Sequence, residues 1–466
     1  MVLFFRLSKR QLPNLLLCFS ILVQFSCKKE NVKVVYPAGS NEDINTWITD
    51  SLKRYYYWTD QLPAHADISK PPLVYFNTVK NTTDPFSYII LPSDPTSGIA
   101  NSKSKFGFDY STIVEQRTGL VIGVIKLVLN DSPASRNGLV RGDYINKING
   151  KQLTRNNAKD LQSELLSGNS VTLSIARISS DQLIADRDVE ISSGATFEQP
   201  ATSKVIAAGN KKIGYLYIND FSPGLAASLY SVFARFKSSG ISDLILDLRY
   251  NSGGQVAEAA GLTAMIANDI NYSTPFIIYQ GNKNGGRRKE SVGDAATYDG
   301  TVNFELALQY NLGLKQIYIL GTGATASASE VMINNLKPYM QVTLIGEVTR
   351  GKDAASFKIS DMRVPKRVAW EMHPIVYKLF NAAGSGDYSG GINPDISVNE
   401  LATLPLLPLG SENDPLINTA ITIIKGAHAQ TVTLAAQTKK RTTGALTVLA
   451  DSKLSASSSS VVVTHR

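Results

Sequence analysis

The sequence contains few of the residues that most often activate a nucleophile or bind a metal ion. Only 2 cysteines and 4 histidines occur among its 466 residues. Both cysteines, Cys18 and Cys27, lie in the N-terminal leader. The rest of the chain can therefore form no disulfide, cysteine nucleophile or thiolate metal site.

Neither positive nor negative charge strongly predominates. The formal net charge of +8 is small for this length, and no stripe of lysine and arginine with interleaved aromatic residues is present. Nucleic acid is therefore not an expected partner. With 43% hydrophobic and 18% charged residues, the composition is that of an ordinary folded protein, long enough for two or three domains.

No hydrophobic run reaches the roughly 20 residues that a membrane-spanning helix needs. The apolar run in "LPNLLLCFSILVQFSC" follows Arg6, Lys9 and Arg10 and ends in small residues, which predicts a secretory signal over 1–27. Cys27, followed by the polar "KKEN", resembles a bacterial lipoprotein processing site. The resemblance implies cleavage before Cys27 and a lipid anchor in the cell envelope, on the periplasmic or the surface side of a bacterial membrane. A plain signal peptide with an incidental cysteine is the alternative.

Changes in residue pattern divide the rest of the chain into four regions. Apolar and aromatic residues at helical spacing in "INTWITDSLKRYYYWTDQLP" predict a small helical module over 28–100. Short apolar strands separated by turns predict a β-rich domain over 105–195. From 200 to 425 strands alternate with helices, which predicts an α/β domain with a largely parallel sheet and sites at the C-terminal ends of its strands. The Ser/Thr-rich residues 426–466 are expected to form a flexible tail.

The β-rich region contains the words "SPASRNGLVRGDYINKING", which resemble a PDZ domain. PDZ domains bind the C-terminal end of a peptide as an added strand, with backbone N–H groups holding the carboxylate. The matching loop here is "KFGFDY", so the resemblance implies that Phe106, Gly107, Phe108 and Asp109 hold the peptide. Gly107 suits a loop whose backbone approaches a ligand closely. The alternative is a small β domain with a structural glycine.

The stretch "GTGATASASE" places two serines, Ser327 and Ser329, in a turn at the end of an expected buried strand. A serine nucleophile needs a base, and the histidines offer little: His373 is the only one inside the α/β region. Lysine is the other option, because burial lowers its pKa. Lys352 in "EVTRGKDAASF" follows the next expected strand, although a surface lysine in a loop is the simpler interpretation of that residue alone.

The segment "ASASE…IGEVTRGK" resembles the C-terminal processing peptidases, also called tail-specific proteases. The resemblance implies that Ser327 is the nucleophile and that Lys352, 25 residues later, is the base. Ser329 is then structural. The order of the other motifs, from the aromatic N-terminal module to "GINPD" at 391–395, also follows the family, over most of the chain from 44 to 425.

The family's "DLRxNxGG" turn occurs here as "DLRYNSGG" at 247–254. It implies an oxyanion hole made by Gly253 or Gly254 together with Ala328. One position departs from the family: Ser356 stands where many members have a glutamine that orients the lysine. Its hydroxyl can still accept a hydrogen bond from Lys352, although with a shorter reach than a glutamine side chain. Ser356 is therefore the candidate for a third catalytic residue.

The leader and the family resemblance together imply an exported serine endopeptidase with a Ser–Lys dyad, acting on polypeptides recognised at their C-terminal end. The fold implied is a ClpP/crotonase-like α/β core with a parallel sheet, an inserted PDZ domain and a helical N-terminal module. Neither a metal nor a cofactor is implied. A non-catalytic peptide-binding protein on the same scaffold is the alternative, and an acyl-CoA enzyme of the crotonase fold is a more distant one.

Overall fold

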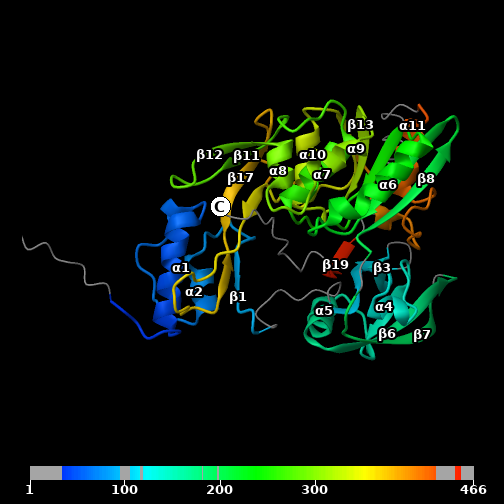
Figure 1. The fold of residues 1–466 in the computed structure, drawn as a ribbon. Helices are drawn as coiled ribbons and strands as arrows, with labels where there is room; N and C mark the ends of the chain where they lie inside the picture. The colour runs from blue at the N-terminus through cyan, green and yellow to red at the C-terminus, as the bar shows by residue number, and fades with distance from the viewer. Residues whose placement is uncertain are drawn as a thin grey trace, which may run out of the picture. The chain divides into compact units, whose positions relative to one another are not determined.

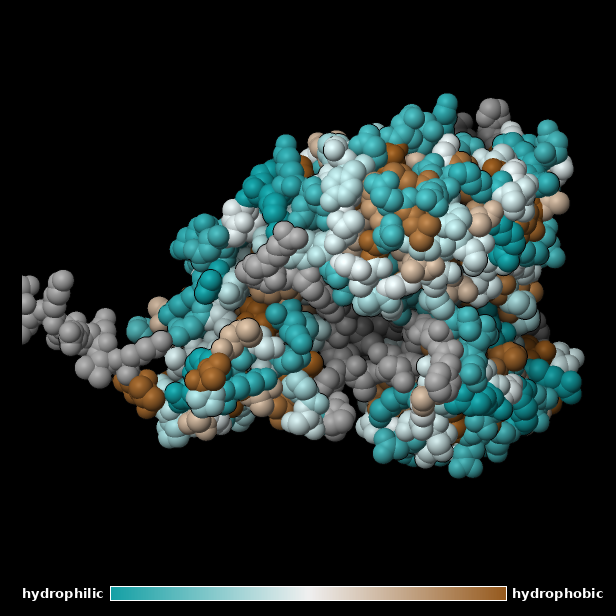
Figure 2. Space-filling view, viewed as in Figure 1, coloured by the Kyte–Doolittle hydropathy of each residue, from teal (hydrophilic) through white to brown (hydrophobic). Residues whose placement is uncertain are grey.

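The computed structural model describes residues 34–94, 105–115, 119–180, 182–196, 199–426 and 447–452. The expected signal over 1–27, with the lipidation candidate Cys27, lies outside these residues. No helix within the described ranges is long and apolar enough to cross a membrane. Hydrophilic residues predominate on the face drawn in Figure 2, with hydrophobic residues scattered among them.

The α/β region is built on a six-stranded sheet whose order is β18-β14-β13-β10-β9-β8. The first five strands in this order run parallel, and β8 pairs antiparallel with β9 at the edge. The largely parallel sheet predicted from the alternation of strands and helices is therefore confirmed. The strands are β8 (Ala201–Ala208), β9 (Lys211–Ile218), β10 (Asp243–Asp247), β13 (Gln316–Gly321), β14 (Gln341–Gly346) and β18 (Ile396–Ser397).

Both faces of this sheet are covered by helices (Figure 1). In β10, Leu244 and Leu246 belong to one buried cluster and Ile245 to the other, because successive side chains of a strand point to opposite faces. The first face carries α6 (Leu225–Ser239), α7 (Val256–Ile266), α8 (Val292–Thr297), α9 (Phe304–Gln309) and α10 (Ala328–Leu336). The second carries α11 (Pro415–Ile424), with the short η3 (Glu400–Ala402) preceding it in the chain.

A four-stranded antiparallel sheet adjoins the first helical layer, with the order β12-β11-β17-β15. Residues of β11 and β17 join the same buried cluster as α7 and α10. The strands are β11 (Pro275–Gln280), β12 (Arg287–Ser291), β15 (Ala354–Ser356) and β17 (Ile375–Asn381). β15 begins two residues after Lys352, so this sheet fixes the chain on the C-terminal side of the candidate base.

The N-terminal region is mostly helical and packs against residues 357–376 of the α/β region. It contains α1 (Asn41–Tyr55), η1 (Thr59–Gln61), α2 (Pro72–Val79) and β1 (Tyr88–Ile90). β1 pairs with β16 (Glu371–His373), and the helices share one buried cluster with side chains from 357–376. The two segments therefore bury each other's apolar surface.

The β-rich region forms a sheet with the order β2-β3-β4-β6-β7, with β5 pairing β4. Its strands are β2 (Phe108–Val114), β3 (Val121–Val128), β4 (Tyr144–Ile148), β5 (Lys151–Gln152), β6 (Ser170–Ser179) and β7 (Gln182–Ser192). Two helices, α4 (Pro133–Arg136) and α5 (Ala158–Ser167), complete it. We call this unit the β-rich domain.

A further strand, β19 (Thr447–Asp451), extends this sheet beyond β2. The expectation that all of 426–466 is a flexible tail is therefore wrong for 447–452. The expectation failed because the pairing partner is supplied by residues more than 300 positions earlier in the chain, which no local pattern reveals.

Candidate active site

Ser327 lies at the N-cap of α10, directly after the turn that follows β13. Its φ of +66° is in the left-handed region, which is unfavourable for a residue with a Cβ atom. The turn is held in place by the neighbouring 247–254 segment. Thr325 Oγ1 donates to the Leu248 carbonyl over 2.8 Å, and Ala326 N donates to the Asn251 carbonyl over 3.1 Å.

The two serines of "SASE" have different surroundings. Ser329 Oγ donates to the Asn251 carbonyl over 3.1 Å, so its hydroxyl ties α10 to the same segment. Ser327 Oγ is buried and has no hydrogen-bond partner among the described residues. Buried hydroxyls are rarely left without a partner, so the Ser327 hydroxyl, and not that of Ser329, is available for chemistry.

Glu330 holds the backbone on both sides of the site. Its Oε2 accepts hydrogen bonds from Ser327 N and Lys352 N, each over 2.8 Å. Its Oε1 accepts from Gly351 N over 2.7 Å and from Thr349 Oγ1 over 2.5 Å. Burial raises the pKa of Glu330, although these four donors act in the opposite direction. The Ser-x-x-Glu spacing is a helix-capping signal, and it was the one sequence feature that could have indicated this role.

Lys352 is brought into the interior of the same site, with 1% of its surface exposed. Burial lowers its pKa from 10.5 to about 7, although the carboxylates of Asp84 and Glu330 act in the opposite direction. Its Nζ lies 5.3 Å from the centre of the Phe86 ring. An amine with this pKa is partly neutral at physiological pH and can accept a proton.

Asp84 and Phe86 come from the N-terminal region, and no sequence pattern indicated that they interact with Lys352. Asp84 is buried, accepts a 2.7 Å hydrogen bond from the Tyr56 hydroxyl, and accepts from the backbone N–H groups of Phe86 and Ser87 over 2.9 and 3.0 Å. Its carboxylate is therefore fixed in position. Ser356, the candidate third residue, is buried at the end of β15.

The 247–254 turn is fixed by a buried network of charges. Arg249 is fully buried and pairs with Asp247 over 2.8 Å, with Asp414 over 2.8 Å and with Glu400 over 3.2 Å. The Tyr250 hydroxyl also donates to Glu400, over 2.6 Å. Because buried charges need such partners, this network restrains the turn that packs against Ser327.

The two glycines of this turn lie against the nucleophile candidate in different ways. A Cβ atom on Gly253 would come within 2.5 Å of Ser327 Cβ, so only glycine fits there. Gly253 N already donates to Asn251 Oδ1 over 2.8 Å. Gly254 has a φ of +140°, and the carbonyl oxygen of Phe221 would lie 2.2 Å from an added Cβ. Both glycines are expected oxyanion donors, but the N–H group of Gly253 already donates to Asn251. Gly254 is therefore the better candidate of the two.

His373 is buried on β16, the strand that pairs with β1. Its ring stacks on Tyr88 at 4.7 Å between centroids and 7° between planes. Burial lowers its pKa to about 4, so it stays neutral at physiological pH.

The four residues expected to hold a peptide lie at the start of β2. The side chains of Phe106 and Phe108 are buried in the core of the β-rich domain, so only their backbone is available to a ligand. Gly107 has a φ of +84°, and an added Cβ would lie 2.1 Å from Ser132 Cβ. Asp109 is also buried and accepts a 3.1 Å hydrogen bond from Ser452 Oγ.

Groups of three or more side chains suited to hold a metal ion are not found within the described ranges.

Two family descriptions match this chain. "Peptidase S41 N-terminal domain" matches residues 43–88, and "Peptidase family S41" matches residues 212–398. The carboxy-terminal-processing protease of Bartonella bacilliformis is 27% identical over 286 residues, which are 59% of this chain and 59% of that protein. The carboxy-terminal processing protease of Bacillus subtilis is 26% identical over 302 residues, which are 63% of this chain and 57% of that protein. The chain thus spans little more than half the length of these relatives.

The fold is similar to that of a solved structure assigned to the S41 proteases, from Bacteroides fragilis. The TM-score is 0.66 at 27% sequence identity, and the match covers 84% of this chain and 98% of the other. The matched family segments contain Ser327, Lys352 and the 247–254 turn in one segment and Asp84 and Phe86 in the other.

Proposed function

Because the chain belongs to peptidase family S41 and is related to the carboxy-terminal processing peptidases, we propose that it is a serine endopeptidase with a Ser327–Lys352 dyad. The observation that carries the proposal is the state of Lys352. Burial lowers its pKa to about 7, and Glu330 holds its backbone and that of Ser327 through one carboxylate oxygen.

The first half of the reaction forms an acyl-enzyme. Neutral Lys352 Nζ accepts the proton of the Ser327 hydroxyl while Oγ attacks the carbonyl carbon of the scissile peptide bond. The carbonyl oxygen becomes an oxyanion. When the tetrahedral intermediate collapses, the C–N bond breaks, and the ammonium of Lys352 returns the proton to the leaving amine. The N-terminal part of the substrate is then an ester of Ser327.

The second half hydrolyses that ester. Lys352 is neutral again after protonating the amine, so it can take a proton from a water molecule that attacks the ester carbonyl. The second tetrahedral intermediate expels Ser327 Oγ, which regains a proton from Lys352. The products are a new C-terminal carboxylate and the released C-terminal fragment.

The oxyanion of both intermediates needs donors that are already in place. We assign them to the N–H groups of Ala328 and Gly254. Ala328 follows the nucleophile at the first position of α10, where backbone N–H groups point out of the helix and favour negative charge. Gly253 then serves as the close neighbour that leaves Ser327 room, because its own N–H is donated to Asn251.

Ser356 is the proposed third catalytic residue. Ser356 is buried on β15, the strand that begins two residues after Lys352. We infer that orientation of the lysine is shared between Ser356 and the N-terminal pair Asp84 and Phe86. The fixed carboxylate of Asp84 interacts electrostatically with Lys352, and the Phe86 ring lies beside its amine.

Substrate delivery is the role proposed for the β-rich domain. Its order of elements and the Gly107 loop support a PDZ-like domain, inserted between the N-terminal region and a ClpP/crotonase-like core, that binds a polypeptide's C-terminal end as a strand. The basic and apolar leader supports export, and Cys27 supports a lipid anchor in a bacterial envelope. The proposed substrates are thus exported proteins with an accessible C-terminal end.

Cleavage of an unfolded model protein tests the dyad. Ser327→Ala and Lys352→Ala are expected to lose activity by at least about 10³-fold, the scale on which nucleophile or base removal acts. Ser329→Ala is the matched control, because it removes a buried hydroxyl from the same turn but not the proposed nucleophile. Activity retained in either dyad variant would contradict the dyad, and absence of cleavage by the wild-type protein would favour the alternative, a non-catalytic peptide-binding protein on a peptidase scaffold.

A further inference from the structure

A segment of the chain's own C-terminal region lies where the proposed function places a peptide ligand. β19 pairs antiparallel with β2, with Thr447 opposite Val114 and Asp451 opposite Ser111. The segment therefore runs toward the loop at 105–108, in the direction that a bound C-terminal peptide would take. Figure 1 shows β19, in red, beside the β-rich domain near β3 and α5.

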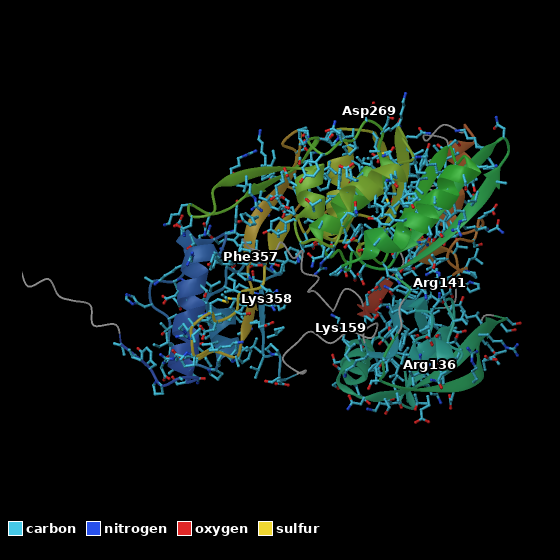
Figure 3. The ribbon with its side chains drawn as sticks, viewed as in Figure 1. Arg136, Arg141, Lys159, Asp269, Phe357 and Lys358 are labelled. Carbon is cyan, nitrogen blue, oxygen red and sulfur yellow. The ribbon has the colours of Figure 1, made fainter. Side chains whose placement is uncertain are left out.

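The other side of the segment contacts α5, on which Lys159 is labelled in Figure 3. Gln162 of α5, itself buried, donates from Nε2 to the Asp451 carbonyl over 3.2 Å. At the end of the segment, Ser452 Oγ accepts from Tyr110 N over 2.9 Å and donates to Asp109 over 3.1 Å. Residues 447–452 thus fill a groove between one strand and one helix, and make contact beside the loop expected to hold a carboxylate.

One buried ion pair fixes the register of the segment. Lys126 of β3 has 4% of its surface exposed, and its Nζ lies 2.6 Å from Asp451 Oδ2. Ser111 Oγ donates to the same carboxylate oxygen. Although burial alone would lower it, the carboxylates of Asp451 and Asp109 raise the pKa of Lys126. A buried ammonium that loses its partner is costly, so the groove favours an occupant that carries a carboxylate here.

The sequence of this region offers one acidic side chain for the role. Asp451 is the only acidic residue between 427 and the end of the chain. The surroundings of Lys126 also lie close to the turn of the proposed active site: its Nζ is 5.9 Å from the Tyr250 ring, and its carbonyl accepts from Arg141, which is labelled in Figure 3.

We propose that residues 447–452 are a built-in occupant of the peptide groove, which a substrate must displace by bringing its own carboxylate to Lys126. This inference rests on the proposed function of the β-rich domain as a peptide-binding unit. The carboxylate is either an acidic side chain or the C-terminal carboxylate of the peptide. The peptidase is thereby restrained by its own tail until a suitable C-terminal segment competes for β2 and α5.

The test is peptide binding to the full chain carrying Ser327→Ala, so that no cleavage interferes. The receptors are this parent, the parent with Asp451→Lys, which places two ammonium groups together, and the parent with Val448→Lys. Val448 belongs to the same strand and has 46% of its surface exposed, so it controls for an added lysine. The probes are three fluorescein-labelled peptides: TVLAD with an amidated end, TVLAN with a free carboxylate, and TVLAN with an amidated end.

Binding to the Asp451→Lys variant is expected to be about tenfold tighter than to the parent. That factor corresponds to a tethered competitor at about 1 mM with a dissociation constant of about 0.1 mM. The Val448→Lys variant should bind as the parent does, and amidated TVLAN should bind most weakly to every receptor. Comparison of amidated TVLAD with free TVLAN tells which carboxylate the groove prefers.

Hydrogen exchange of the β2 amides provides the second measurement, without any added peptide. Exchange is expected to be faster in the Asp451→Lys variant than in the parent and the control. Equal peptide affinity and equal β2 exchange in all receptors would overturn the inference while leaving the groove a peptide site. Faster exchange with no binding of any peptide would instead overturn the peptide-binding role, and with it the displacement step.

Discussion

Ser327 and Lys352 donate their backbone N–H groups to the same atom, Oε2 of Glu330, each over 2.8 Å. A residue that is neither the proposed nucleophile nor the proposed base thus sets the separation of the two chain segments that carry them. The sequence places these segments 25 residues apart, on the turns after β13 and β14.

Glu330→Gln should therefore reduce activity without unfolding the protein. The amide has one oxygen to accept hydrogen bonds, and its NH₂ group would face backbone N–H donors, so one side of the site has to move. Misplacement of reacting groups by about 1 Å can cost about 10²-fold in rate, and we expect a loss of kcat/KM of that order.

Glu258→Gln is the matched control for this substitution. Glu258 is also buried on a helix and accepts from the backbone N–H groups of Gly224 and Ala226 over 2.6 and 2.7 Å, neither of which belongs to the dyad. The two variants should lose similar amounts of stability, measured by thermal unfolding, but only Glu330→Gln should lose most of its activity. Equal losses of activity would mean that Glu330 acts through stability alone.

The pH dependence of kcat/KM should show an acid limb near pH 7, because Lys352 has to lose its proton before it can act as a base. Asp84→Asn removes a negative charge that raises the pKa of Lys352, so the limb should move to lower pH. Asp50→Asn, an exposed position on α1, should leave the limb in place. A limb that moves to higher pH in the Asp84 variant, or not at all, contradicts this electrostatic role.

The buried amine of Lys352 should make the protein more stable as pH rises, whereas a lysine in an ordinary ion pair makes it less stable. In the folded chain Lys352 releases its proton near pH 7, whereas in the unfolded chain it does so near 10.5. Between these values the unfolded state binds more protons, so the free energy of unfolding gains up to about 1.4 kcal/mol per pH unit from this group as pH rises.

Lys352→Met removes the group while keeping most of its volume. It should stabilise the protein most at pH 7 and below, and this advantage should shrink as the pH approaches 10. Denaturant unfolding of both proteins across this range measures the difference directly. A difference that does not vary with pH would show that the pKa of Lys352 is the same in the folded and the unfolded chain.

The close contact between Gly253 and Ser327 predicts a steric effect of a single methyl group. Gly253→Ala places a Cβ within 2.5 Å of Ser327 Cβ, at a φ of +107° that disfavours a side chain, and should abolish cleavage. Gly209→Ala also sits at positive φ, +68°, but has no atom within 4 Å of its added Cβ. It should cost about 1 kcal/mol in stability and leave kcat/KM unchanged, and an active Gly253→Ala enzyme would contradict the assigned packing.

Much of the core was predictable because its signals are local. Continuous apolar runs ending in glycine turns indicated the parallel strands, and helical spacing indicated the layers around them. The motif words around Ser327, Lys352 and Gly253 lie at strand ends, so the sequence could place them at one edge of the sheet before any side-chain contact was known.

The features that the sequence did not reveal depend on contacts between distant segments. Asp84 and Phe86 reach Lys352 only because β1 pairs with β16, and a strand of three residues gives no periodic signal. β19 was missed for the same reason, since "TVLAD" is short and lies in a Ser/Thr-rich region. Glu330 was visible as part of "SASE", but the tertiary fold is needed to show that it accepts hydrogen bonds from two separate segments.

The central claim is that Ser327 is a nucleophile activated by Lys352, and covalent labelling tests it most directly. The protein is treated with a fluorophosphonate at pH 8, digested, and the modified peptide is mapped by mass spectrometry. The account predicts a single adduct on Ser327, strongly reduced in Lys352→Met and retained in Ser329→Ala. An adduct on Ser329, or labelling of Ser327 that is as fast in Lys352→Met as in the wild type, would contradict it.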